Sequence, residues 1–325
     1  MRNTHRHAVF SQRHRRAIIL SLLGAALVYL VVAMASGTTQ VWQALSRLGI
    51  GGWLLLLGCS FCSYLLRFAR WQYYLRRVGW KLPLRLHLAY YLAGFALTTT
   101  PGKAGETIRS VLLHPHGIPY PTSLACFFSE RLLDVVVVAM LATFTTVAFT
   151  GQQDFILVVF AITLAVIPFV HSPLLIKLLQ ALHSYTRSLR FRRLLTHLQK
   201  LLHDARNFLA LRPLYLGLLL GMFAWSLQGF AFYYLMHAIG LELPLPLAMG
   251  IYAISLLAGA LSMIPGGIGA TEAAMALLLS AAGATPPIAV IIPLISRLTT
   301  LWFAVALGLL AAVWLARYRR APQLP

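Results

Sequence analysis

The chain alternates between long runs of apolar residues and short segments rich in arginine, glycine and proline. A helix needs about 20 apolar residues to cross the hydrocarbon core of a bilayer, and several of the runs approach or exceed that length. The runs are continuous and lack the every-second-residue alternation of barrel strands, which favours helices over a β-barrel. The pattern predicts membrane-spanning helices at residues 17–35, 51–69, 122–150, 155–170, 214–237 and 288–315.

Two further apolar units are shorter and are interrupted by Pro-Gly pairs, at Pro101 and at Pro265. The first piece of the first unit would be a helix of only ~22 Å, against a hydrocarbon core of ~30 Å. Short apolar pieces on either side of such a break are typical of re-entrant hairpins. We therefore expect an all-α membrane protein with about six transmembrane helices and two inverted re-entrant helical hairpins, formed by residues 86–100 with 106–113 and 244–264 with 271–282.

Residues 172–212 differ from the spans because leucines at helical spacing alternate there with eight basic side chains. This pattern is typical of amphipathic helices that lie on a membrane surface. A soluble helical hairpin on the cytoplasmic side is the alternative interpretation.

The basic residues fall almost entirely on one side of the predicted topology. With the N-terminus in the cytoplasm, the basic loops 70–85, 172–212 and 317–320 are cytoplasmic, and the opposite loops hold one basic residue, Arg47. We expect a multi-pass protein of the bacterial inner membrane with both termini in the cytoplasm. The Arg- and His-rich start followed by residues 17–35 also resembles a signal peptide, but its length favours an uncleaved first helix.

Composition supports the membrane interpretation: 59% of the residues are hydrophobic, 10% are charged and the mean hydropathy is +0.77. A soluble domain carries about 25% charged residues, so a soluble enzyme is excluded. The net charge of +20 does not indicate nucleic-acid binding, because the basic residues lie in short loops between spans. The same charges suit anionic lipid headgroups. We expect a single polytopic membrane domain over residues 1–325.

The two broken units match each other in order along the chain. In each, a glutamate follows the Pro-Gly break and an arginine follows the glutamate by 25 residues: Glu106 with Arg131, and Glu272 with Arg297. Three spans separate the units, so they are expected to enter from opposite faces, as in alternating-access transporters. Chance similarity between glycine- and leucine-rich segments is the alternative. The expected repeats cover residues 86–150 and 245–315.

Charged and glycine residues in these units are the candidate site. Charged side chains within apolar segments are costly in free energy and are therefore functional candidates. Glycines allow a ligand to approach the backbone, and N–H groups at a helix start suit an anion. The candidate substrate-binding residues are Gly102, Lys103, Gly105, Glu106, Arg109, Glu130, Arg131, Asp134, Gly266, Gly267, Gly269, Glu272 and Arg297.

Two interpretations of these residues are open. In the functional one, glycine amides together with Arg109, Arg131 and Arg297 bind a phosphate-bearing headgroup, while Glu106 and Glu272 hold a cation or proton. In the structural one, Glu106 pairs with Arg131 and Glu272 pairs with Arg297, and each pair locks a hairpin to the following span. Both can hold together.

Other polar residues are given structural roles. Arg67 and Arg70, one helical turn apart and followed by Trp71, are expected to reach the interface and anchor the helix there. The chain shows no Ser/His/Asp arrangement, no nucleotide-binding loop and no metal-ligand cluster of recognised spacing. We therefore expect no catalytic residues, no metal and no cofactor.

These motifs resemble the membrane region of lysylphosphatidylglycerol synthases, a family that includes stand-alone membrane proteins without the synthase domain. The resemblance implies a flippase-type domain that moves aminoacylated or otherwise modified phospholipids between leaflets. No synthase domain follows Arg320, so lysyl transfer by this chain is not expected. The matching segments are residues 66–71, 101–106 with Arg109, 130–134, 265–269 with Glu272, and Arg297.

The sequence thus predicts an inner-membrane lipid translocase that acts on anionic or modified phospholipids. An intramembrane lipid or glycolipid transferase, or its partner subunit, is the first alternative, and a small-solute or ion transporter is the second. Expected partners are lipids, with a homo-oligomer or a lipid-modifying enzyme compatible with the same pattern, and no nucleic acid.

Overall fold

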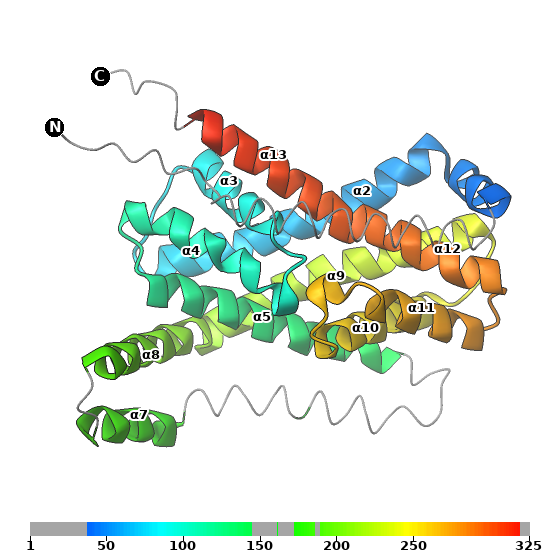
Figure 1. Ribbon diagram of the computed structural model, residues 1–325. Coiled ribbons are helices and arrows are strands. Elements are labelled where there is room, and N and C mark those ends of the chain that lie inside the picture. The colour runs from blue at the N-terminus through cyan, green and yellow to red at the C-terminus, as the bar shows by residue number, and fades with distance from the viewer. Residues whose placement is uncertain (1–37, 145–160, 162–171, 186–188, 319–325) are drawn as a thin grey trace.

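The computed structural model of the protein describes residues 38–144, 161, 172–185 and 189–318, and the regular elements in these ranges are all helices joined by short turns, without strands (Figure 1). The predicted all-α fold is therefore confirmed. The predicted spans 17–35 and 155–170, and with them the fate of the first helix, lie outside the described residues. The elements are α2 (Thr38–Arg77), α3 (Leu84–Phe95), η1 (Pro101–Thr107), α4 (Ile108–Leu113), η2 (His114–His116), α5 (Tyr120–Ala142), α7 (Pro173–Tyr185), α8 (Leu189–Phe208), α9 (Leu211–Ile239), α10 (Leu245–Leu261), η4 (Pro265–Gly267), α11 (Ala270–Ala281), α12 (Pro286–Arg297), η5 (Leu298–Trp302) and α13 (Phe303–Tyr318).

Three segments of the described chain are long and apolar enough to cross a membrane: Ser46–Arg77, Leu211–Ile239 and Pro286–Tyr318. The third comprises α12, the π-helical turn η5 and α13, which continue one another. Helix α5 occupies the predicted span that starts at residue 122, and it carries three charged residues within its apolar sequence. Within the described residues, the predicted apolar spans are therefore helical.

Helices α2 and α9 form an antiparallel pair that runs the length of the bundle. Near one end, Arg47 of α2 donates to the carbonyl of Ile239, the last residue of α9 (3.2 Å). Near the other end, the hydroxyl of Tyr74 donates to the carbonyl of Pro213 at the start of α9 (3.2 Å). Because the two helices run in opposite directions, the segments that follow them begin at opposite ends of the bundle.

The same kind of turn follows both long helices. Gly79 and Gly240 adopt left-handed backbone conformations with φ of 90° and 92°, which glycine tolerates best. Pro83 and Pro244 then precede the first residues of α3 and α10. The matching turns send α3 and α10 back along the bundle toward each other.

Helix α3 ends at Phe95 and α10 ends at Leu261, a few residues before Pro101 and Pro265, so each unit is interrupted near the predicted Pro-Gly break. The chain forms 3₁₀ turns in η1 and η4 and then continues into the short helices α4 and α11. The two breaks meet in the middle of the bundle (Figure 1). A methyl group placed on Gly266 would lie 3.3 Å from the Cα atom of Thr99, so the backbones are in close approach.

The long helix that follows each hairpin packs against the hairpin of the other half. Helix α5, which follows the first hairpin, packs along α10. Helix α13, which follows the second, packs along α3, and Gly308 allows this contact because a side chain there would meet the backbone of Ala96. The two halves of the chain therefore hold each other's hairpins.

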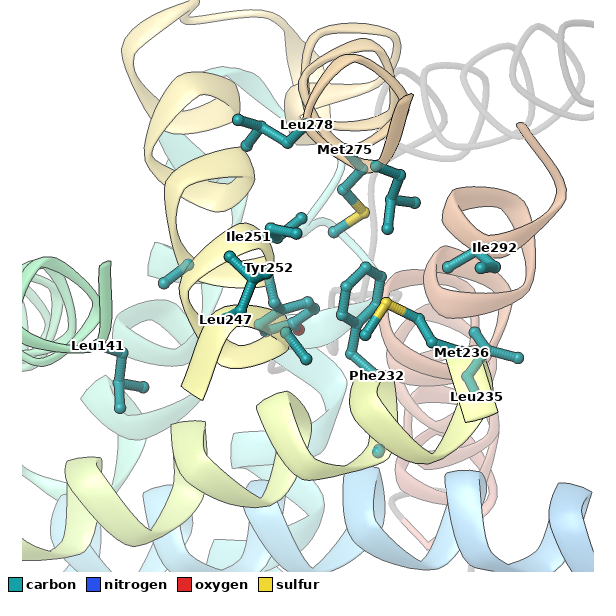
Figure 2. Packing of buried hydrophobic residues seen from close by; sticks show 14 of the residues in the cluster. Leu141, Phe232, Leu235, Met236, Leu247, Ile251, Tyr252, Met275, Leu278 and Ile292 are labelled. Atoms are coloured by element: carbon teal, nitrogen blue, oxygen red, sulfur yellow. The ribbon is translucent and has the colours of Figure 1, made fainter. Parts of the chain in front are cut away.

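Two groups of buried apolar side chains fill the bundle. One lies between α9, α10, α11 and α12, where Phe232 and Met236 face Tyr252, Met275 and Ile292 (Figure 2). The other joins α2, α3 and α5 and is rich in aromatic rings, including Trp71, Tyr91 and Phe95. The charged residues of α5 lie between these two groups, within a densely packed interior.

The predicted amphipathic segment forms two helices, α7 and α8. Helix α8 packs against α5 through buried side chains that include Leu195 and Phe208. The hydroxyl of Thr122 at the start of α5 donates to Asp204 (2.6 Å), which fixes this contact. On the same leucine-rich side, nearer the N-terminal end of α8, Leu194 and Leu198 remain exposed, as expected for a helix lying on a membrane surface.

Candidate functional site

A network of buried ion pairs centres on Asp134 of α5. One carboxylate oxygen, Oδ1, accepts from Arg70 Nη2 (2.6 Å) and from Trp225 Nε1 (3.2 Å). The other, Oδ2, lies 3.1 Å from Arg131 Nη2 and 3.7 Å from Arg67 Nη2. Three arginines from two helices therefore surround one aspartate in the interior.

The positions of Arg67 and Arg70 correct the expectation that they anchor an interface. Arg70 is fully buried and also contacts Glu130 (Nε to Oε1, 3.5 Å) and the carbonyl of Gly217 (3.3 Å). Arg67 is 4% exposed. The acidic pair on α5 explains the difference, because an arginine with a buried carboxylate partner need not extend to the interface.

Arg109 of α4 connects the first break to this network. Its Nη2 atom donates to Glu106 Oε2 (2.6 Å), and its Nη1 atom lies 3.7 Å from Glu130 Oε2. The guanidinium carbon lies 4.0 Å from the centre of the Tyr91 ring, a cation–π contact. Thr98 donates to the second oxygen of Glu106 (2.7 Å). Glu106 therefore pairs with Arg109 where the sequence suggested Arg131.

Gly94 of α3 makes room for the Arg109 side chain. A Cβ atom at this position would overlap Arg109 Nε and lie 2.9 Å from its Cγ. Gly94→Ala should therefore displace a pinned arginine and lower the free energy of unfolding by about 1–3 kcal/mol. Equilibrium unfolding in mixed detergent micelles measures the change. Gly51→Ala is the matched control, because no atom lies within 4 Å of a Cβ there. Equal effects of the two substitutions would contradict the packing of Arg109 on Gly94.

The second break is held by Glu272 and Arg297, the pair that the sequence suggested. Arg297 Nε donates to Glu272 Oε1 (2.9 Å), and its Nη2 atom donates to the carbonyl of Gly266 within the break. Glu272 Oε2 accepts from the backbone N–H of Gly269 (2.7 Å) at the start of α11. The pair therefore closes the turn and caps the helix that follows it.

Several glycine amides of the breaks are engaged within the chain. The N–H of Gly105 donates to Thr100 Oγ1 (2.6 Å), and the N–H of Gly267 donates to the carbonyl of Ile264 (2.8 Å). The amide of Gly269 is bound by Glu272. These three amides do not provide free donors for an anion, so side chains are the principal donors at the site.

A cavity of about 220 Å³ lies between the two breaks. Its polar walls come from η1, α5, α9, η4, α11 and α12, and its apolar walls come from α5, α10 and the residue before η4. The polar lining residues are Thr100, Lys103, Arg131, Asp134, Trp225, Thr271 and Arg297, and the apolar ones include Val135, Val138, Leu256, Leu257 and Ile264. The cavity is therefore lined by both charged and apolar side chains.

A second cavity of about 50 Å³ adjoins the first. The two share Lys103, Trp225, Leu256 and Arg297 as lining residues. The additional polar groups of the smaller cavity are Tyr64, Arg67, Thr98, Glu106, Gln228, Tyr252 and Thr300. Together the cavities bring residues from both halves of the chain to one site.

Comparison with known proteins identifies the family of this chain. The family model described as the lysylphosphatidylglycerol synthase TM region matches residues 18–308. The chain belongs to this family. It is also 21% identical over 324 residues to a UPF0104 membrane protein of Methanothermobacter thermautotrophicus (strain Delta H), covering 92% of this chain and 95% of that protein. The resemblance seen in the motifs is thus confirmed, and the chain is a membrane protein.

Within this family member, the candidate residues divide into two groups. Lys103, Arg131, Asp134, Gly266, Gly267 and Arg297 line the main cavity, and Glu106 lines the smaller one. The second group lines neither cavity and comprises Gly105, Arg109, Glu130, Gly269 and Glu272; Gly102 lies in η1. Arg109 and Glu272 each pair with a lining residue, and Glu130 contacts Arg70 and Arg109.

Sequence reasoning missed the contributions of α2, α9 and α10 to the site. Arg67, Trp225, Gln228 and Tyr252 all line a cavity, and Tyr252 donates to Gln228 (2.6 Å). A signal for Arg67 existed, because two carboxylates inside one apolar span require cationic partners on neighbouring helices. The aromatic and amide residues carried no comparable signal, since such residues are common in helix interiors.

Proposed function

We propose that the protein is a lipid translocase of the flippase type, which moves a lipid between the two leaflets of its membrane. The observation that carries this proposal is the cavity between the two Pro-Gly breaks. Charged and hydroxyl groups line it together with valine and leucine side chains. Among membrane substrates, a lipid matches this combination, because its headgroup needs polar partners and its chains need apolar ones.

The arrangement of the hairpins supports movement of the lipid as well as binding. The hairpins begin at opposite ends of the α2 and α9 pair, and their breaks meet at the cavity. We regard the two halves as an inverted repeat, since each contributes a long helix, a broken hairpin and a second long segment in the same order. Inverted repeats of this kind support alternate opening of a central site to the two sides of a membrane.

The proposed orientation places both termini in the cytoplasm of a bacterium, in its inner membrane. Exposed basic side chains at the C-terminal end of α2, including Arg76 and Arg77, then lie on the same side as α7, α8 and the end of α13. This distribution agrees with the rule that basic loops stay in the cytoplasm.

A translocase fits the carboxylates better than an intramembrane transferase does. A general acid or base must be able to exchange a proton with a substrate. Glu106, Glu130 and Asp134 are instead held in ion pairs with arginines, and Glu106 also accepts from Thr98. These carboxylates therefore suit a role in positioning arginine side chains.

Reconstituted vesicles test the proposal. Purified protein should accelerate the movement of tail-labelled fluorescent phospholipids between leaflets, measured by the rate at which a membrane-impermeant quencher reaches the label. Arg131→Gln should lower this rate about tenfold or more, because it removes a charged donor from the cavity wall. Arg192→Gln, an exposed change on α8, should leave the rate unchanged. No rate above that of empty vesicles, for every lipid in the panel, would refute the proposal.

A further inference from the structure

We infer that the lipid bound in the cavity carries a net negative, phosphate-bearing headgroup, held by the side chains of Lys103 and Arg131. The inference rests on the proposed function and adds the charge of the headgroup to it. It predicts that the protein binds an acidic lipid in preference to a lipid whose headgroup carries an added positive charge.

The acidic groups of the cavity walls are already engaged. Asp134 accepts hydrogen bonds from Arg70 and Trp225 and is approached by two further arginines. Glu106 accepts from Arg109 on one oxygen and from Thr98 on the other. A cationic headgroup would have to compete for these carboxylates with guanidinium groups that are already in place.

Two arginines of the cavity walls keep a nitrogen atom without a hydrogen-bond partner, as Asp134 Oδ2 does among the acceptors. Arg131 lines the main cavity, and its Nε and Nη2 atoms are buried without a hydrogen bond, although Nη2 lies in ion-pair contact with Asp134. Arg67 lines the smaller cavity, is 4% exposed, and leaves its Nε atom without a partner. These nitrogens are themselves buried, so what the two arginines bring to the cavities is positive charge, which favours an anion there.

Lys103 adds a positive charge at the boundary of the two cavities. It lines both, and no carboxylate in the described part of the chain forms an ion pair with it. Its backbone is left-handed with φ of 57°, and its N–H donates to the carbonyl of Thr100 (2.9 Å). A non-glycine residue in this conformation is uncommon, and such backbone strain concentrates at ligand sites.

The residues that line the two cavities carry more positive than negative charge. Of the described residues, Arg67, Lys103, Arg131 and Arg297 face two carboxylates across the joined cavities. In surroundings of low dielectric constant, an excess of positive charge favours an anion far more strongly than it would in water. The cavity is therefore electrostatically matched to a headgroup of opposite sign.

The apolar walls favour a lipid over a free anion. Val135, Val138 and Leu257 line the main cavity together with its charged groups. Next to the cavity, at the end of α10, Leu261 and Met263 are 62% and 63% exposed. These apolar surfaces would accommodate acyl or prenyl chains, whereas inorganic phosphate would leave them without a partner.

The test compares binding in detergent with movement in vesicles. Thermal stabilisation of the purified full-length protein is measured with phosphatidic acid, phosphatidylglycerol, phosphatidylcholine and lysyl-phosphatidylglycerol, and with inorganic phosphate at the same concentrations. The same lipids, labelled in the tail, are then followed in the vesicle assay. The two acidic lipids should stabilise the protein and should move at least about tenfold faster than the other two.

Lys103→Asn is the diagnostic variant, because asparagine tolerates a left-handed backbone while the charge is removed. It should weaken binding of acidic lipids about tenfold or more and leave the Tm of the lipid-free protein nearly unchanged. Lys200→Gln, an exposed change on α8, is the matched control and should bind as the unmodified chain does.

Each outcome has a distinct meaning. Equal stabilisation by all four lipids and equal movement of all four would refute the inferred headgroup charge but would still support the proposed translocase activity. Stabilisation by inorganic phosphate equal to that by phosphatidic acid would overturn the lipid headgroup in favour of a soluble anion. Selective binding of acidic lipids with no movement of any lipid would support the inferred site and would refute the proposed translocase activity.

Discussion

Replacing Arg70 with alanine is expected to lower the free energy of unfolding by about 3–5 kcal/mol. The Arg70 side chain is fully buried and contacts Asp134, Glu130 and the carbonyl of Gly217. Its removal leaves two buried carboxylates with fewer cationic partners and opens a void between α2, α5 and α9. The loss of charge compensation dominates, because an unpaired charge in an apolar interior is far more costly than a small void.

Equilibrium unfolding in mixed detergent micelles, followed by tryptophan fluorescence, measures this effect. Arg77→Ala is the control: it removes the same group from the same helix two turns later, where the side chain is exposed, and should change stability by no more than about 0.5 kcal/mol. Similar values for the two variants would show that the buried network does not contribute to folding as described.

Gly308→Ala is expected to have the second largest effect, a loss of about 2–3 kcal/mol. A Cβ atom at Gly308 would overlap the backbone nitrogen of Ala96 and lie 2.7 Å from the carbonyl carbon of Phe95. Because the opposing atoms belong to the backbone, no side chain can rotate to relieve the overlap, and α13 must move away from α3. The smaller effect expected for Gly94→Ala follows from the same reasoning, since an arginine side chain can shift.

Gly58→Ala on α2 serves as the control for this substitution. No atom lies within 4 Å of a Cβ there, and alanine is the better helix former, so stability should be unchanged or should rise by up to about 1 kcal/mol. Unfolding in detergent again gives the values. A Gly308→Ala variant as stable as the unmodified chain would contradict the close contact between α3 and α13.

The fold was predictable because the bilayer imposes strong rules on sequence. Continuous apolar runs can only become helices, and the Pro-Gly pairs at Pro101 and Pro265 interrupt those helices by removing donors and relaxing the backbone. The pair of Glu272 with Arg297 was also accessible from the 25-residue spacing of Glu and Arg in each unit, although the same spacing gave the wrong partner for Glu106. The apolar runs, the Pro-Gly breaks and the spacing of Glu272 and Arg297 can all be read directly from the sequence.

The partners of buried charges were less predictable, because they depend on which helix faces act as neighbours. Arg67 and Arg70 follow a long apolar run, and such arginines equally suit an interface. Only the packing of α2 against α5 and α9 shows that they turn inward. Glu106 had two arginines at plausible spacings, and the contact of the Arg109 side chain with the Tyr91 ring favours the nearer one.

Two short strings are shared by the C-terminal ends of α2 and α9 and the turns that follow them. Residues 73–75 and 233–235 both read Tyr-Tyr-Leu, and residues 82–84 and 243–245 both read Leu-Pro-Leu. In the structure these segments flank the matching turns at Gly79 and Gly240. The likeness between the two halves therefore includes the ends of both long helices.

The exchange of hairpins between the halves has a consequence for how this chain can change over time. Helix α5 rests on α10 and α13 rests on α3, so each half supplies a wall that the other lacks. A substitution on one face must therefore be accommodated by residues encoded far away in the chain. Neither half on its own would enclose the cavity, so the chain cannot lose one half and keep the cavity.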